Sequence, residues 1–183
     1  MKTIILISAL SICSLILLSM TGPDKTLYDF HAKTIDGKDF NFSSLRGKKV
    51  LIVNTASKCG YTPQYKQLEE VFKNYGGKGF TIIGFPANNF GSQEPGNNAS
   101  ISEFCTKNYG VTFQMMEKIS VKGSDIDPLY KWLTSKEENG KLDAPVKWNF
   151  QKFLIDENGK VADVAMSDEL PDSDRIIKWI RGK

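Results

Sequence analysis

Cysteine is the residue type in this chain best able to do chemistry, because a thiolate is a strong nucleophile. The sequence contains Cys13, Cys59 and Cys105. Cys59 lies between an apolar run and a predicted helix, a position where free backbone N–H groups and the helix dipole stabilise a thiolate. Thr62 stands where a Cys-x-x-Cys motif would have its second cysteine. Any cysteine that pairs with Cys59 must therefore be distant in sequence.

The scarcity of histidine narrows the chemistry open to Cys59. His31 is the one histidine, and it lies on a predicted hairpin where we expect it to face solvent. Cysteine hydrolases and transferases that need a Cys-His pair thereby lose support, and a metal site of nitrogen and sulfur ligands is equally hard to build. A lone thiolate remains suited to attack on a weak, soft bond such as that of a peroxide, with sulfenic acid as the first product.

The hydrophobic pattern predicts the elements that must position Cys59. Turn residues separate short runs of alternating polar and apolar residues from longer apolar runs, and other segments have apolar residues at helical spacing. The expected order is a hairpin over 30–35 and 39–42, a buried strand over 50–53, a helix after Thr62-Pro63, a second buried strand over 80–85, a helix that carries Cys105, a helix over 128–133, a hairpin over 152–156 and 160–164, and a helix over 172–180. This order predicts an α/β thioredoxin-like sandwich, in which helices flank a central mixed β-sheet and a β-hairpin lies at the N-terminus.

Two helix starts can be assigned from capping residues. Thr62 followed by Pro63 predicts an N-cap and a proline at the first helical position. Ser100 and Glu103 have the spacing of a capping box for the helix that carries Cys105, which we expect to stop before Gly110.

Composition indicates one globular domain and a separate leader. The chain has 183 residues, with 40% hydrophobic and 25% charged residues, and its net charge of +3 is scattered, which argues against nucleic acid as a partner. Lys2 and an apolar stretch over 4–18 resemble a secretory leader. We therefore expect residues 1–22 to be a signal peptide or N-terminal membrane leader and residues 23–183 to form the domain. The protein would then be exported, and either periplasmic or associated with the cell envelope.

Two other fates of the leader stay open. An uncleaved anchor would give the protein its only membrane contact, although the apolar run is shorter than the roughly 20 residues that span a bilayer. Lipid attachment at Cys13 is the other alternative, although Ile12 stands where that motif requires a small residue.

Three segments carry a resemblance to the glutathione peroxidase family. The segment 53–62, Val-Asn-Thr-Ala-Ser-Lys-Cys-Gly-Tyr-Thr, resembles the family's peroxidatic loop with cysteine in place of selenocysteine. The segment 85–95, Phe-Pro-Ala-Asn-Asn-Phe-Gly-Ser-Gln-Glu-Pro, and the segment 148–150, Trp-Asn-Phe, are similar to the second and third signatures in the same order. The resemblance covers roughly residues 26 to 181 and implies a thiol peroxidase that acts on hydrogen peroxide and on organic or lipid hydroperoxides.

The resemblance also implies the site residues. Gln93, Trp148 and Asn149 would complete a catalytic tetrad with Cys59, as uncharged donors that stabilise negative charge while the peroxide splits. Cys105 lies in a segment similar to the one that holds the resolving cysteine of thioredoxin-dependent members. The implied reductant is a thioredoxin-like protein, with glutathione as the alternative, and no cofactor or metal is expected.

Departures from the family pattern bear on the region around Cys105 and on assembly. Ala87, Asn89 and Gln114 stand where many relatives have cysteine, glutamine and proline, and the last of these changes is expected to loosen the region around Cys105. The stretch from Trp132 to Trp148 lacks the long insertion of tetrameric relatives, which favours a monomer.

Two other functions use the same residues. A redox-sensing module would pass oxidation of Cys59 and Cys105 to a partner protein. An exported thiol-disulfide exchanger is disfavoured by the missing Cys-x-x-Cys motif. The sequence leaves open the preferred hydroperoxide, the physiological reductant, the fate of the leader, and whether Cys59 and Cys105 form a disulfide in the resting protein.

Overall fold

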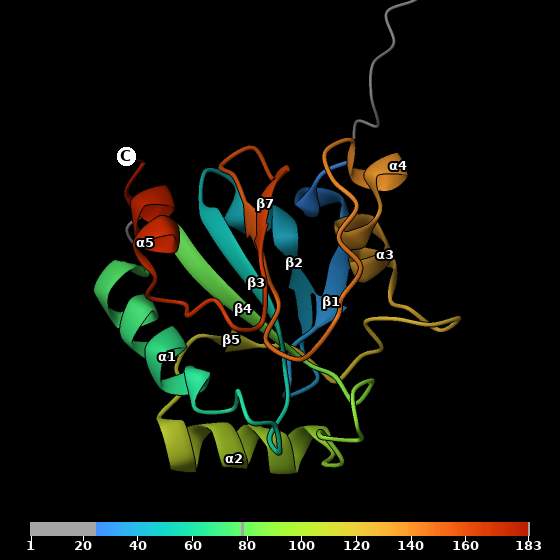
Figure 1. Ribbon diagram of the computed structural model, residues 1–183, viewed down its shortest axis with the longest axis vertical. Helices are drawn as coiled ribbons and strands as arrows, with labels where there is room; N and C mark the ends of the chain where they lie inside the picture. The colour runs from blue at the N-terminus through green and yellow to red at the C-terminus, as the bar shows by residue number, and fades with distance from the viewer. Residues whose placement is uncertain (1–24, 78, 183) are drawn as a thin grey trace, which may run out of the picture.

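The protein is built around a central mixed sheet, as its pattern predicted (Figure 1). The computed structural model describes residues 25–77 and 79–182, so the predicted leader lies outside the described residues. The sheet has five strands in the order β5-β4-β3-β6-β7. They are β3 (Lys49–Thr55), β4 (Phe80–Pro86), β5 (Gln114–Met115), β6 (Lys152–Ile155) and β7 (Val161–Ala165). β3, β4 and β5 are parallel, whereas β6 and β7 run antiparallel to their neighbours.

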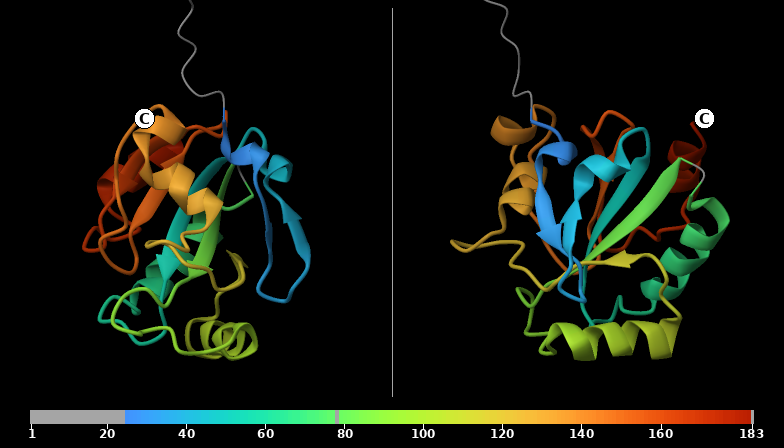
Figure 2. Two further views of the ribbon diagram at one scale, coloured as in Figure 1. Left: turned by 90° about the vertical axis from the view of Figure 1, so that its right-hand side faces the viewer. Right: turned by 180° about the vertical axis from the view of Figure 1, so that it is seen from behind.

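Helices cover both faces of the sheet (Figure 2). They are α1 (Gln64–Tyr75), α2 (Asn98–Tyr109), α3 (Pro128–Thr134), α4 (Lys136–Asn139) and α5 (Asp174–Arg181). A separate two-stranded sheet pairs β1 (His31–Lys33) with β2 (Asp39–Asn41), and short 3-10 turns cover Leu27–Asp29 and Phe42–Leu45. This hairpin is the one predicted before the core, and His31 is exposed on it, as expected. None of the helices in the described residues is both long and apolar enough to cross a membrane.

Strand β3 divides the interior into two apolar layers because successive side chains point to opposite faces. Val50 and Ile52 pack in the layer that contains the hairpin and α3. Leu51 and Val53 pack in the layer that contains α1, α2 and α5. Buried on both faces and paired on both edges, β3 is the rigid element from which the Cys59 loop departs.

The start of α2 differs from the prediction. The helix begins at Asn98, and the Asn97 side chain accepts the Ser100 backbone N–H at 2.9 Å. The predicted capping box of Ser100 and Glu103 is therefore wrong, because Asn97 is the N-cap and its side chain accepts a backbone N–H of the first turn. The predicted stop is right: Gly110 caps the C-terminus with φ 61°, a conformation that glycine adopts without steric cost.

Candidate active site

Three segments distant in sequence meet at one edge of the sheet. β3 and β4 are parallel, so the loops that follow Thr55 and Pro86 leave the sheet at the same edge. β6 is antiparallel to β3, so the segment that precedes Lys152 reaches that edge too. These segments carry the predicted site residues Cys59, Gln93, Trp148 and Asn149. Figure 1 shows α2 running across this end of the sheet.

The Cys59 loop is closed by its own polar groups. The Cys59 thiol is free and 8% exposed, and its sulfur accepts the Tyr61 backbone N–H at 3.4 Å. Its backbone N–H donates to the Thr62 hydroxyl oxygen at 2.9 Å, and that hydroxyl donates to the Ala56 carbonyl at 2.8 Å. Thr62 therefore holds the loop together. The prediction that Thr62 is the N-cap of α1 is wrong, because Pro63 occupies that position, without a side-chain hydrogen bond.

Gln93 and Asn149 contact each other directly. The Asn149 Nδ2 group donates to Gln93 Oε1 at 2.9 Å, and the Asn149 side chain is fully buried. The Gln93 backbone carbonyl accepts the Lys58 N–H at 3.0 Å, which joins Gln93 to the residue before Cys59. Because the Gln93 amide uses its oxygen on Asn149, its NH₂ group remains as a donor.

The backbone is strained on either side of this contact. Among the described residues, the non-glycine residues with positive φ are Ser92 at 52° and Phe150 at 64°, the immediate neighbours of Gln93 and Asn149. Such a conformation costs on the order of 1–3 kcal/mol and persists only where surrounding contacts enforce it. At Phe150 these contacts are a backbone bond to the Asn54 carbonyl at 2.6 Å and a buried edge-on contact with Tyr65.

Trp148 lies at the surface beside these groups. The residue is 39% exposed, and its ring packs against that of Phe90 with centroids 5.5 Å apart. Its backbone carbonyl accepts Nδ2 of the buried Asn54 at 3.1 Å. Asn54 thus fixes the 148–150 segment to β3. Sequence reasoning missed this role, although Asn54 lies inside the quoted peroxidatic segment.

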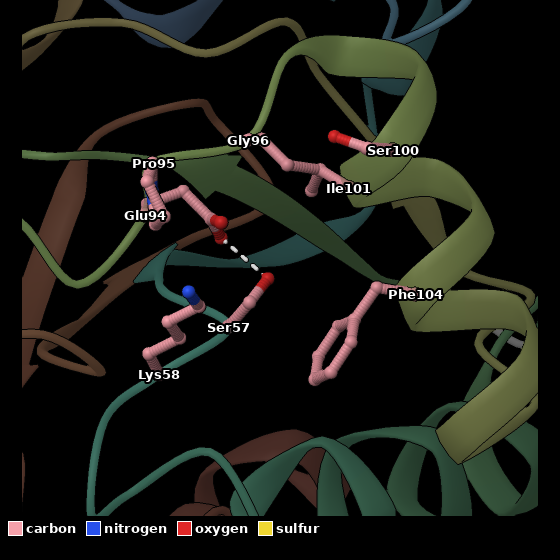
Figure 3. A pocket seen from close by; sticks show the side chains of 8 residues that line it. All are labelled: Ser57, Lys58, Glu94, Pro95, Gly96, Ser100, Ile101 and Phe104. Atoms are coloured by element: carbon pink, nitrogen blue, oxygen red, sulfur yellow. Dashed lines mark hydrogen bonds between the residues drawn. The ribbon is translucent and has the colours of Figure 1, made fainter.

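A cavity of about 230 Å³ separates the Cys59 loop from α2 (Figure 3). Ser57 and Glu94 line one side, and Ile101 and Phe104 of α2 line the other. The Ser57 hydroxyl donates to Glu94 Oε2 at 2.9 Å. Burial raises the pKa of the Glu94 carboxyl, and hydrogen bonds from Ser57 oppose this rise. Glu94 was not singled out from the sequence, and its only signal was its place directly after Gln93.

Cys105 lies on α2, an element separate from the Cys59 loop, and is also a free thiol. Its side chain is 1% exposed. Burial raises the pKa of the Cys105 thiol to about 11; the neighbouring Tyr65 hydroxyl opposes this rise and the charge of Glu94 adds to it. Cys59 and Cys105 border the same apolar layer. The structure therefore holds Cys105 as a buried, protonated thiol.

Fold and site together define a thioredoxin-fold protein with a free thiol, Cys59, on a loop that is bonded to the Gln93–Asn149 pair through Lys58. Within 25–77 and 79–182, no three His, Cys, Asp or Glu side chains are grouped so as to hold a metal ion.

Comparison with known proteins gives the family. The family model described as "Glutathione peroxidase" matches residues 27–134. The chain is 55% identical over 136 residues to glutathione peroxidase-like peroxiredoxin 2 of Saccharomyces cerevisiae, covering 74% of this chain and 84% of the relative. It is 43% identical over 156 residues to a hydroperoxy fatty acid reductase of Synechocystis, covering 80% and 92%.

Solved structures agree with the fold. The crystal structure of Trgpx in apo form has a TM-score of 0.66 and 42% identity, and the match covers 86% of this chain and 97% of that one. A thiol:disulfide interchange protein from Chlorobium tepidum, with a TM-score of 0.57 and 23% identity, covers 87% and 95% and shares the thioredoxin-like fold.

The chain therefore belongs to the glutathione peroxidase family. It is a thiol peroxidase, an enzyme that reduces hydroperoxides with a thiol co-substrate and without a prosthetic cofactor.

Proposed function

We propose that Cys59 is the peroxidatic residue. Its thiolate attacks one oxygen of the hydroperoxide, the O–O bond breaks, Cys59 becomes a sulfenic acid, and the departing alkoxide or hydroxide takes up a proton. The observation that carries the proposal is a continuous set of contacts. The Cys59 loop is bonded to Gln93 through Lys58, and Gln93 is bonded to Asn149.

Gln93, Asn149 and Trp148 form the rest of the proposed tetrad. The NH₂ group of Gln93 is left free by its contact with Asn149, so it can donate to the thiolate or to the leaving oxygen. Asn149 fixes the orientation of Gln93, and the indole N–H of Trp148 is a further donor without an acceptor role. Uncharged donors placed before the reaction stabilise charge as it develops.

Cys105 is the proposed resolving residue. Its thiol condenses with the Cys59 sulfenic acid, which forms a disulfide and releases water. Because the Cys105 thiol is buried on α2, this helix must open locally before the two sulfurs meet. A thioredoxin-like dithiol then reduces the disulfide and restores both thiols, with glutathione as the alternative reductant.

Several properties of the working protein complete the proposal. We propose a monomer, because the stretch from Trp132 to Trp148 is short, and a function in defence against oxidative stress. We also propose export to the periplasm or cell envelope by the leader over residues 1–22, which the sequence pattern supports. Immunoblotting of periplasmic, membrane and cytoplasmic fractions tests the location.

The test of function measures consumption of cumene hydroperoxide with thioredoxin, its reductase and NADPH, beside glutathione, for wild type, Cys59→Ser and Cys105→Ser. We expect turnover with thioredoxin that is lost in both variants. Activity that survives Cys59→Ser would refute the proposal. Rapid oxidation of wild type without turnover would instead favour a peroxide sensor.

A further inference from the structure

A buried carboxylate joins helix α1 to the segment that follows α2. Glu69 lies on α1, and its side chain is 4% exposed. Its two oxygens accept two hydrogen bonds from one residue, the Thr112 backbone N–H at 2.8 Å and the Thr112 hydroxyl at 2.6 Å. The Lys73 ammonium, which is largely exposed, lies 3.3 Å from one of these oxygens. Two short bonds to a charged acceptor make this a strong contact.

The contact lies next to the helical turn that holds Cys105. The Val111 backbone N–H, one residue before Thr112, donates to the Cys105 carbonyl at 3.3 Å. The N–H of Gly110 donates to the Thr106 carbonyl at 3.0 Å, which completes the cap of α2. The last turn of α2 is thus bonded, through the Cys105 carbonyl, to Val111. Val111 is directly followed by Thr112, which Glu69 holds. Holding Thr112 therefore restrains the turn through the bond of Val111 to the Cys105 carbonyl.

The packing around this turn leaves room for movement. A cavity of about 170 Å³ is lined by Cys105 and Thr106 of α2 and by Val111 and Thr112 of the following segment. A turn that borders such a space has room to open on that side. The Glu69 bonds to Thr112 restrain the segment that directly follows the turn.

We propose that Glu69 is a positioning residue that controls disulfide formation by holding Thr112 and, through it, the Cys105 turn. The inference rests on the proposed resolving role of Cys105. The intact contact keeps the Cys105 thiol buried, and its release exposes the thiol to the Cys59 sulfenic acid. Weakening the contact should speed resolution without changing the reaction of Cys59 with peroxide.

The test compares four variants of the reduced protein. Glu69→Gln keeps the shape and removes the charge and one acceptor, while Thr112→Val removes the hydroxyl donor and keeps the β-branch. Glu70→Gln is the matched control, because it removes the same charge from an exposed position on the same helix. Lys73→Met removes the exposed partner and leaves the Glu69 contact with Thr112 in place.

Rapid mixing with hydrogen peroxide, followed by acid quench, alkylation and mass spectrometry, measures two rates separately: formation of sulfenic acid and formation of the disulfide. Loss of a charged hydrogen bond predicts about tenfold faster disulfide formation in Glu69→Gln and a smaller rise in Thr112→Val. The two controls should match wild type in both rates.

The outcomes separate this inference from the proposed function. Unchanged or slower disulfide formation in both Glu69→Gln and Thr112→Val would overturn the role of Glu69. A wild-type protein that forms no disulfide between Cys59 and Cys105 would instead overturn the proposed cycle. A general loss of structure would slow the reaction of Cys59 with peroxide, whereas the inference requires that step to stay unchanged while disulfide formation accelerates.

Discussion

Replacing Gln93 by glutamate separates the donor role of this residue from its structural role. The glutamate has the same shape, and one of its oxygens can still accept the Asn149 Nδ2 group now placed 2.9 Å from Gln93 Oε1. What is lost is the NH₂ group, and a negative charge is added beside the thiolate. Removal of one preorganised donor lowers the rate by about 100- to 1,000-fold in comparable sites.

We therefore expect Gln93→Glu to react with peroxide at least about 100-fold more slowly than wild type while its unfolding midpoint in urea changes little. Gln93→Leu is the matched control without charge, since it removes both donor and acceptor. It should lose comparable activity and, because Asn149 is left without its acceptor, about 1–3 kcal/mol of stability.

The assay is the second-order rate of Cys59 oxidation under single-turnover conditions, followed by trapping of the sulfenic acid. This rate excludes effects on the reductant. A rate for Gln93→Leu within about threefold of wild type would refute the donor role, because that loss is far below the range for one donor. Slow oxidation of Gln93→Glu alone would assign the effect to the added charge.

Two further predictions follow from buried polar groups. Thr62→Val removes both hydrogen bonds of the hydroxyl, so it should lower stability by about 1–3 kcal/mol and slow Cys59 oxidation. Thr62→Ser keeps the hydroxyl and should have the stability and the oxidation rate of wild type. Urea titrations and single-turnover assays measure the two properties. Burial lowers the pKa of Lys152 from 10.5 to about 7, so the folded state binds fewer protons than the unfolded state between these values. The stability of wild type should therefore rise with pH over this window, relative to that of Lys152→Met. Urea titrations of both proteins at several pH values measure this. A difference in stability between the two that stayed constant with pH would contradict the prediction.

The sequence alone was sufficient for the fold and for the identity of the candidate residues. Alternation and apolar runs predicted the two hairpins, the central strand and the following helix, because buried strands and amphipathic helices impose regular spacing. Three long motifs indicated the family, which the comparisons confirmed. The roles of Cys59, Gln93, Trp148, Asn149 and Cys105 stay predictions.

Local patterns failed where side chains had competing partners. Thr62 has the type and position of an N-cap, yet its hydroxyl bonds to Cys59 and Ala56. Ser100 begins a capping-box spacing, yet Asn97 caps α2. A propensity reflects only the neighbours of a residue in sequence. A loop that folds back on itself offers its polar groups other hydrogen-bond partners, and these compete with the helix N-terminus.

Only the tertiary structure decided how distant residues meet. The pairing of β3 with β4 and β6 brings Gln93 and Asn149 to the same end of the sheet, where their side chains are in contact. Packing of α2 against α1 buries Cys105 and places Thr112 on Glu69, 43 residues apart in the chain. Such contacts depend on the relative placement of whole elements, which the spacing of residues within one segment does not encode.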